Sequence, residues 1–184
     1  MHPSFLFSFN ILFLIIPALV FAAPFPATSS SSFVTAKKGL FRSPLGFEIS
    51  SGQTNWEMAQ PSRPNPYVLT EYRSPDWSFG VQGALTVRVD NVSKSKTLKS
   101  YVNQWLRDYS RFGLKVTASR PIKLGAHAAY MIDMVNPTNQ RQLRQFLFQK
   151  KKNTIILTCR AHQKRFDSTV KDCNQIAKNF RWIL

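Results

Sequence analysis

The sequence is short of acidic side chains, with nine Asp and Glu against 25 Lys and Arg among 184 residues. The nine carboxylates are scattered singly, so no pair of them indicates general acid–base catalysis. The formal net charge is +16. A field of this sign favours anionic partners, although a basic protein can also owe its charge to solubility alone.

Residues that carry catalysis are equally few. Only three histidines occur, and His127 and His162 are the two that lie outside the apolar N-terminal segment. His127 and Asp133 share one face of a predicted strand, but six strand residues span about 20 Å, too far for a catalytic dyad. The chain has no GxSxG, Gly-rich phosphate loop, HExxH or EF-hand loop. The sequence therefore predicts no catalytic residue, no metal site and no cofactor, and an enzyme is the least favoured class.

The first 22 residues contain no Lys, Arg, Asp or Glu. They are apolar from residue 5 onward and end in small residues, as is typical of a signal peptide. Val20 and Ala22 suit positions −3 and −1, which favours cleavage after Ala22. The alternative is an uncleaved anchor, because the apolar segment approaches the length of a membrane span. We therefore expect an exported protein, periplasmic or secreted, that meets a membrane only if the segment is retained.

Three regions are expected along the chain: a signal peptide at 1–22, a flexible Ser/Pro-rich leader at 23–38 and a single α+β domain at 39–184. Residue patterns predict strands at 40–42, 46–50, 67–72, 85–89, 114–124, 126–135, 143–150 and 154–160. Residues 51–66 are predicted to form turns, and residues 74–83 are predicted to form a loop.

Two helices complete the pattern. Apolar residues from Leu98 to Phe112 recur at helical spacing and predict an amphipathic helix. Thr97 or Ser95 can cap its start, and Gly113 suits its end. A second helix is predicted at about 167–178. Strands, a helix, more strands and a final helix indicate an α+β fold in which helices cover an antiparallel sheet.

Only two cysteines occur, Cys159 and Cys173. Cys159 lies on the more apolar face of a predicted strand, and Cys173 lies on the apolar face of the following helix, so both thiols point into one layer. Export to an oxidising compartment favours a disulfide between them. The alternative is two free cysteines that fill the core as small apolar groups.

A run of basic residues without any acidic one extends from Arg141 to Arg165. These candidate anion-binding residues are Arg141, Arg144, Lys150, Lys151, Lys152, Arg160, Lys164 and Arg165. The three consecutive lysines lie at a predicted hairpin tip, free to reach phosphates or sulfates. The alternative is a hydrated turn that protects a sheet edge.

Four aromatic side chains permit either a core or a binding role. Phe146 and Phe148 alternate with polar residues on a strand, so we expect them in the core. Trp77 and Phe79 stand in the predicted loop, where periodicity gives no reason for large apolar groups. They either line a partner surface or plug the end of the sheet.

The order of elements resembles the PsbP-like fold family, named for the extrinsic PsbP protein of photosystem II and shared by many small exported domains. The matching segments, within residues 39–182, are Gly46-Phe47-Glu48-Ile49 with Trp56 downstream, the helix at Leu98–Phe112, the Leu124-Gly125 turn into the strand with Ala128 and Tyr130, the hairpin around Lys151, and the closing helix with Phe180-Arg181-Trp182. The resemblance implies an antiparallel sheet with helices on both sides, an α/β/α sandwich. It also implies a non-catalytic accessory or binding role.

These observations favour a non-catalytic exported domain that binds a protein or an anionic component of the cell envelope. The alternative is a polyanion-binding protein that uses residues 141–165 on anionic lipid, glycan or nucleic acid, of which nucleic acid is not favoured.

Overall fold

The computed structural model describes residues 39–61, 65–91 and 96–183. The expected signal peptide at 1–22 and leader at 23–38 lie outside these ranges. Within them, no helix is both long enough and apolar enough to cross a membrane.

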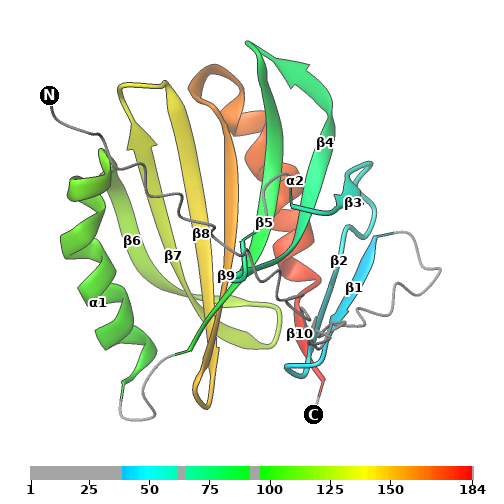
Figure 1. The fold of residues 1–184 in the computed structure, drawn as a ribbon, viewed down its shortest axis with the longest axis vertical. Coiled ribbons are helices and arrows are strands. Elements are labelled where there is room, and N and C mark those ends of the chain that lie inside the picture. The colour runs from blue at the N-terminus through cyan, green and yellow to red at the C-terminus, as the bar shows by residue number, and fades with distance from the viewer. Residues whose placement is uncertain (1–38, 62–64, 92–95, 184) are drawn as a thin grey trace, which may run out of the picture. The chain divides into compact units, whose positions relative to one another are not determined.

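In the described residues, seven antiparallel strands form the main sheet, in the order β3-β4-β5-β9-β8-β7-β6 (Figure 1). Their bounds are β3 Glu57–Ala59, β4 Val68–Ser78, β5 Val81–Asn91, β6 Lys115–Leu124, β7 His127–Asn136, β8 Arg141–Lys150 and β9 Asn153–His162. Most neighbours in the sheet are consecutive in sequence and are joined by tight turns. The β5–β9 pair is the exception, and it joins the two halves of the domain.

A smaller sheet of β1 (Leu40–Ser43), β2 (Phe47–Ser50) and β10 (Arg181–Trp182) brings the last residues of the domain beside the first. The ring of Phe180 stacks on that of Phe47 at 5.5 Å. The Tyr72 hydroxyl lies within hydrogen-bond distance of the carbonyl oxygens of Gly39 and Ile49, at 3.0 and 2.9 Å. These contacts attach the small sheet to the main one.

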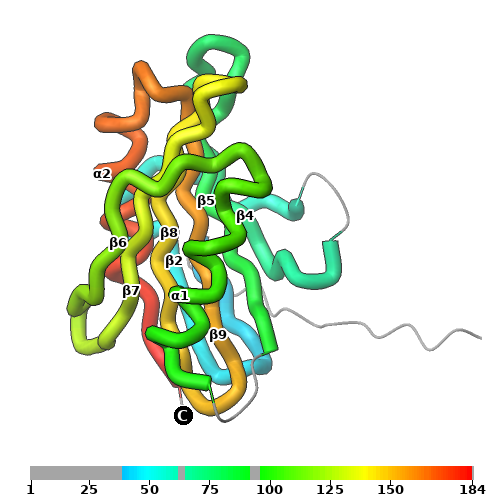
Figure 2. The backbone as a smooth tube through the Cα atoms, turned by 90° about the vertical axis from the view of Figure 1, so that its left-hand side faces the viewer, coloured from blue at the N-terminus to red at the C-terminus, as the bar shows by residue number. Residues whose placement is uncertain are grey.

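Two helices lie on opposite faces of the main sheet (Figure 2). The first, α1 (Leu98–Asp108), begins at Thr97, whose side chain accepts a hydrogen bond from the Ser100 N–H. It continues as the short helix η1 (Tyr109–Phe112) and ends at Gly113, which has a left-handed backbone, as predicted. The second, α2 (Phe166–Lys178), follows the short helix η2 (Gln163–Arg165) directly after β9.

Strand alternation gives the main sheet two separate cores. The core on the α2 side includes Phe146, Phe148, Leu157, Ile176 and Phe180. The core on the α1 side is formed by Tyr101, Val102, Tyr109, Ile132, Met134, Leu147 and Ile156. Successive residues of β8 thus point to opposite layers. Phe146 and Phe148 are buried on the α2 side, as expected, and the two cores show that a helix packs on each face of the sheet.

The structure corrects two of the predicted segments. The supposed loop at 74–83 is the upper part of the β4–β5 hairpin, and the turn-rich segment 51–66 contains the short strand β3. Pro75 is the reason why the segment 74–83 was predicted as a loop. It sits where the β4–β5 register shifts between Arg73 and Trp77, so its missing N–H removes no regular ladder bond.

Candidate functional site

Cys159 of β9 and Cys173 of α2 are joined in a disulfide, with their Cα atoms 5.9 Å apart. Both residues are fully buried in the α2-side core. The bond closes a loop of 14 residues and ties the middle of α2 to the strand that precedes the helix. A loop of this size contributes about 3 kcal/mol to stability. The disulfide therefore holds the connection between β9 and α2 in place.

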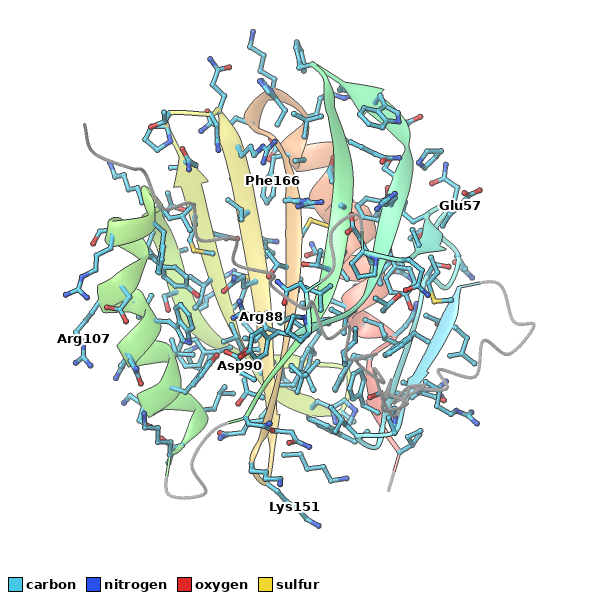
Figure 3. All side chains as sticks on the ribbon, viewed as in Figure 1. Glu57, Arg88, Asp90, Arg107, Lys151 and Phe166 are labelled. Carbon is cyan, nitrogen blue, oxygen red and sulfur yellow. A yellow bond between two sulfur atoms is a disulfide. The ribbon has the colours of Figure 1, made fainter. Side chains whose placement is uncertain are left out.

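The candidate anion-binding residues do not form one surface. In the β8–β9 hairpin, Lys150 pairs with Asn153 beside the turn, whereas Arg141 pairs with His162 at the far end. Nine residue steps along β8 separate these positions, which is about 30 Å. The lysine tip, residues 150–152, therefore lies at one end of the sheet, where Figure 3 labels Lys151. The remaining surface cations, Arg141, Arg160, Lys164 and Arg165, lie at the other.

Arg144 has a structural role, because its guanidinium group is engaged by neighbouring side chains of the domain. Its Nε and Nη2 atoms donate to the two carboxylate oxygens of Asp133 on β7, at 2.7 and 2.8 Å. Its Nη1 atom donates to Asn174 of α2 at 3.3 Å. Such a two-pronged arginine–carboxylate pair is strong and directional. Arg144 thus links two strands to the helix above them.

Trp77 and Phe79 do not plug the end of the sheet, because 67% and 60% of their surfaces are exposed. Trp77 lies near the end of β4, and Phe79 lies in the tight turn of the β4–β5 hairpin, where Phe79 and Gly80 have φ angles of 54° and 69°. A left-handed conformation suits Gly80 but strains a bulky residue such as Phe79. Strained positions of this kind concentrate at functional sites.

Three chain connections meet around Phe79. Its ring stacks on that of His162, with centroids 4.5 Å apart, and the Lys164 Nζ atom lies 5.4 Å from its centre. The His162 Nδ1 atom accepts from the Lys164 N–H at 3.3 Å, so its Nε2–H faces the Gln140 side-chain oxygen at 3.2 Å. The Gln163 N–H also donates to the Gln140 carbonyl oxygen. The β4–β5, β7–β8 and β9–α2 connections are thereby held together.

We call this region the aromatic–basic end. It comprises Trp77, Phe79, Arg141, Arg160, Lys164 and Arg165. The sequence predicted its aromatic and basic members as two unrelated sets. The structure brings them together because the β4–β5 turn and the end of β9 lie at the same end of the sheet.

An open groove adjoins this end on the α1 side of the sheet. Arg73 of β4 and Arg160 of β9 flank Ala84 of β5 in one row of the sheet. Two strand spacings put the two arginine Cα atoms about 10 Å apart. Both guanidinium groups converge on Oε1 of Glu71, with Arg73 Nε at 3.2 Å and Arg160 Nη2 at 3.1 Å. The carboxylate of Glu71 is almost fully buried, so it fixes both arginines.

Arg141 and Trp77 complete the wall of this arginine groove, which encloses about 300 Å³. We define it by Glu71, Arg73, Trp77, Arg141 and Arg160. Three arginines and one glutamate give it a net charge of +2. In the described part of the chain, α1 packs on β7 and β8 and reaches Arg88 and Asp90 of β5, but no residue of α1 lines the groove (Figure 1). The groove is therefore open to a partner.

Sequence reasoning missed Glu71 and Arg73. They lie 89 and 87 positions before Arg160, outside the basic run, and strand pairing through β5 brings them together. One signal was present, because Glu71 lies near the end of the predicted strand 67–72 and Arg73 would share its face if that strand continued by one residue. Two opposite charges on one strand face predict an ion pair, but they do not reveal a partner from a distant strand.

A smaller pocket of about 90 Å³ lies beside the same hairpin, lined by His162, Asp76 and Asp172, with Ser74 and Ser168 among its other residues. Both ring nitrogens of His162 are engaged as described above. Asp172 accepts from the Trp56 indole N–H at 3.1 Å. Among the described residues, no hydrogen bond joins His162 to a carboxylate or hydroxyl. Those residues also include no group of three metal-ligating side chains.

Polar side chains continue down the open sheet face toward α1, where Figure 3 shows Arg88 and Asp90. The Tyr101 hydroxyl donates to Asp90, and the Tyr109 hydroxyl donates to Gln145 at 2.6 Å. Burial raises the pKa of Tyr109 to about 12, and burial together with the bond to Asp90 raises the pKa of Tyr101 further above its ordinary value. Both tyrosines are therefore neutral donors at physiological pH.

The architecture places this domain among α+β folds of the PsbP-like type. Among solved structures, the chain is similar to cyanobacterial PsbP (CyanoP) from Synechocystis sp. PCC 6803, with a TM-score of 0.59 and 13% identity over 85% of this chain and 99% of that one. It is also similar to LpqN, involved in cell envelope biogenesis of Mycobacterium tuberculosis, with a TM-score of 0.57 and 10% identity over 75% and 83% of the two chains.

A third similar structure is PA94, a protein of unknown function from Pseudomonas aeruginosa. Its TM-score is 0.53 and its identity 15%, over 77% of this chain and 94% of that one. No protein-family model matches the chain, and no curated protein matches its sequence. At these identities the similarity shows the fold, which confirms the predicted resemblance.

Proposed function

We propose that the protein is a non-catalytic, exported binding domain of the cell envelope, and that the aromatic–basic end is its partner-binding surface. The observation that carries this proposal is the exposure of Trp77 and Phe79 beside four cationic side chains. Large exposed aromatic groups beside arginines are typical of residues that dominate protein interfaces. The stacking of Phe79 on His162 still leaves 60% of its surface exposed, and no periodic pattern of the hairpin accounts for Trp77.

The chemistry of this end favours an anionic partner. Within the described residues, no carboxylate lies at ion-pair distance from Arg141, Lys164 or Arg165. These three cations are therefore available to complement negative charge, which directs association and specificity. The hydrogen bonds around Gln140 and His162 hold the surface in one shape before a partner arrives, which reduces the entropy cost of binding.

Export is supported by two independent features. The N-terminal segment has the composition of a signal peptide, and the domain contains a disulfide, which persists in oxidising compartments. The similar protein LpqN is described as involved in cell envelope biogenesis, which agrees with an envelope role here.

The proposal can be tested with two charge-matched double variants and a heparin column as the anionic probe. Lys164→Gln with Arg165→Gln removes two charges from the aromatic–basic end, and Lys151→Gln with Lys152→Gln removes two from the lysine tip. We expect only the first variant to elute at clearly lower salt. The slope of the logarithm of its binding constant against the logarithm of salt concentration should become shallower by about one for each lost contact with the anion.

Circular dichroism and thermal melting would first establish that both variants are folded, which we expect because all four side chains are exposed. Equal losses in the two variants would mean that retention reflects overall charge alone. A larger loss in the tip variant would assign binding to the lysine tip. Either result contradicts the proposed surface.

A further inference from the structure

We propose that the arginine groove binds a phosphate monoester group carried by the anionic partner, with Arg73 and Arg160 as its principal ligands. This inference rests on the proposed function, because the groove shares Trp77, Arg141 and Arg160 with the aromatic–basic end. It adds the chemical class of the group that is recognised and the residues that recognise it.

The first argument is the number of hydrogen-bond donors that remain free. A guanidinium group has five N–H donors in a rigid plane. Arg73 uses two of them, on Glu71 and on the Gln60 carbonyl oxygen at 3.1 Å. Arg160 uses one, on Glu71. Among the described residues, several N–H donors of each arginine therefore have no partner and can serve a ligand, and Glu71 already holds the two groups in converging positions.

The second argument is charge. The groove carries a net +2, from Arg73, Arg141 and Arg160 against Glu71. A phosphate monoester carries about −1.5 to −2 at neutral pH, which matches this charge. A single carboxylate would neutralise only half of it. Arginine planes also pair two N–H groups with two oxygens of one phosphate, which gives directional recognition.

The third argument is the shape and lining of the groove. Its volume of about 300 Å³ is at the lower limit for small-molecule sites, large enough for a phosphate with a small attached body. Ala84 and Gly80 line it with minimal bulk, whereas Trp77 offers an exposed ring face at its edge. The group attached to the phosphate would therefore pack on Trp77, with the phosphate on Arg73 and Arg160.

Three small probes separate these contributions: phenyl phosphate, inorganic phosphate and benzoate. Each is titrated into the ¹⁵N-labelled protein, and NMR follows the arginine Nε–H and tryptophan indole signals. We expect saturable shifts of Arg73, Arg160 and Trp77 with phenyl phosphate. Inorganic phosphate should bind more weakly because it lacks the ring. Benzoate should bind about tenfold more weakly or worse, because it has the ring but only one charge.

Variants assign the binding to particular residues. Arg160→Gln should weaken phenyl phosphate binding about tenfold or more. Arg107→Gln, which removes an exposed charge on α1 far from the groove (Figure 3), should not. Trp77→Ala should remove the advantage of phenyl phosphate over inorganic phosphate. Because Trp77 is exposed, this second variant tests the site even if Arg160→Gln does not fold.

The inference is overturned if none of the probes gives a saturable shift, if benzoate binds as tightly as phenyl phosphate, or if Arg107→Gln weakens binding as much as Arg160→Gln. Its failure is separable from failure of the proposed function. The heparin test changes Lys164 and Arg165, which leaves the groove intact. Heparin retention that depends on those two residues, without phenyl phosphate binding, would overturn the groove alone. Phenyl phosphate binding, together with heparin retention that does not depend on Lys164 and Arg165, would overturn the proposed surface alone.

Discussion

The two ends of the main sheet carry similar positive charge in different surroundings. At one end, Lys151 and Lys152 lie on a two-residue turn, with exposed and flexible side chains. At the other end, Lys164 and Arg165 lie in a short helix beside exposed Phe79 and within a set of hydrogen-bonded connections. A flexible hydrated lysine loses entropy on binding, whereas a pre-positioned cation loses less.

The comparison shows that local charge density is a poor indicator of a binding surface in a basic protein. The lysine tip has the densest run of positive charge in residues 141–165, yet within the described residues only Lys150 of this tip contacts an aromatic ring, that of Trp182 at 5.5 Å. The aromatic–basic end has fewer consecutive charges but combines them with exposed rings and a fixed backbone. Rigidity and mixed chemistry, more than charge, distinguish it.

The largest expected effect comes from removing the disulfide, which is the covalent contribution to the rigidity of the aromatic–basic end. Cys159→Ala with Cys173→Ala should lower the free energy of unfolding by about 3 kcal/mol, because the loop closed by the disulfide becomes unrestricted in the unfolded chain. Urea unfolding measures this loss. Hydrogen exchange should accelerate at the amides of residues 163–170 and stay unchanged at the lysine tip.

Reductant provides the control for this first prediction. It should lower the stability of the native protein to that of the double variant and leave the double variant unaffected. Unchanged urea midpoints, or equal acceleration of exchange at both ends, would show that the disulfide does not make the difference between the two ends.

A smaller loss is expected when the shared carboxylate of the groove is neutralised. Glu71→Gln leaves Arg73 and Arg160 without their common charged acceptor, which should cost about 2 kcal/mol. The matched control is Glu57→Gln on neighbouring β3, where the side chain is exposed and should change stability by less than about 0.5 kcal/mol. Equal urea midpoints for the two variants would contradict the positioning role of Glu71.

The smallest expected effects come from glycine substitutions at a left-handed backbone position, which each end of the sheet contains. These effects should differ between the two ends. Phe79 and Lys151 both have a left-handed backbone, with φ near 54° and 55°. Relief of this strain should make Lys151→Gly more stable by about 0.5 kcal/mol. Phe79→Gly should gain nothing, since the lost stacking on His162 offsets the relief.

The two glycine variants should also differ in binding. Phe79→Gly should weaken heparin retention without a change in salt slope, because no charge is removed, whereas Lys151→Gly should not weaken it beyond the loss of one general charge. If Phe79→Gly stabilises the protein and leaves retention intact, the exposed ring has no role in binding and the strain at Phe79 needs another explanation.

Much of the fold could be predicted because it depends on local periodicity. The apolar spacing from Leu98 to Phe112 defined α1 and its caps, and alternation defined most of the strands. The hairpin around Lys151 and the facing positions of Cys159 and Cys173 followed from the same patterns. The segment around Pro75 could not be predicted in this way, because a register shift interrupts the alternation there.

The sequence by itself determined the α+β class, the alternation of side chains in most of the strands, and the location of the basic run, since neighbouring residues decide these properties. The tertiary structure alone decided which charges meet. Strand pairing brought Glu71 and Arg73 to Arg160, engaged Arg144 with Asp133, and separated the lysine tip from the other cations by the length of a hairpin. Contacts between distant strands depend on sheet order, which no short stretch of sequence encodes.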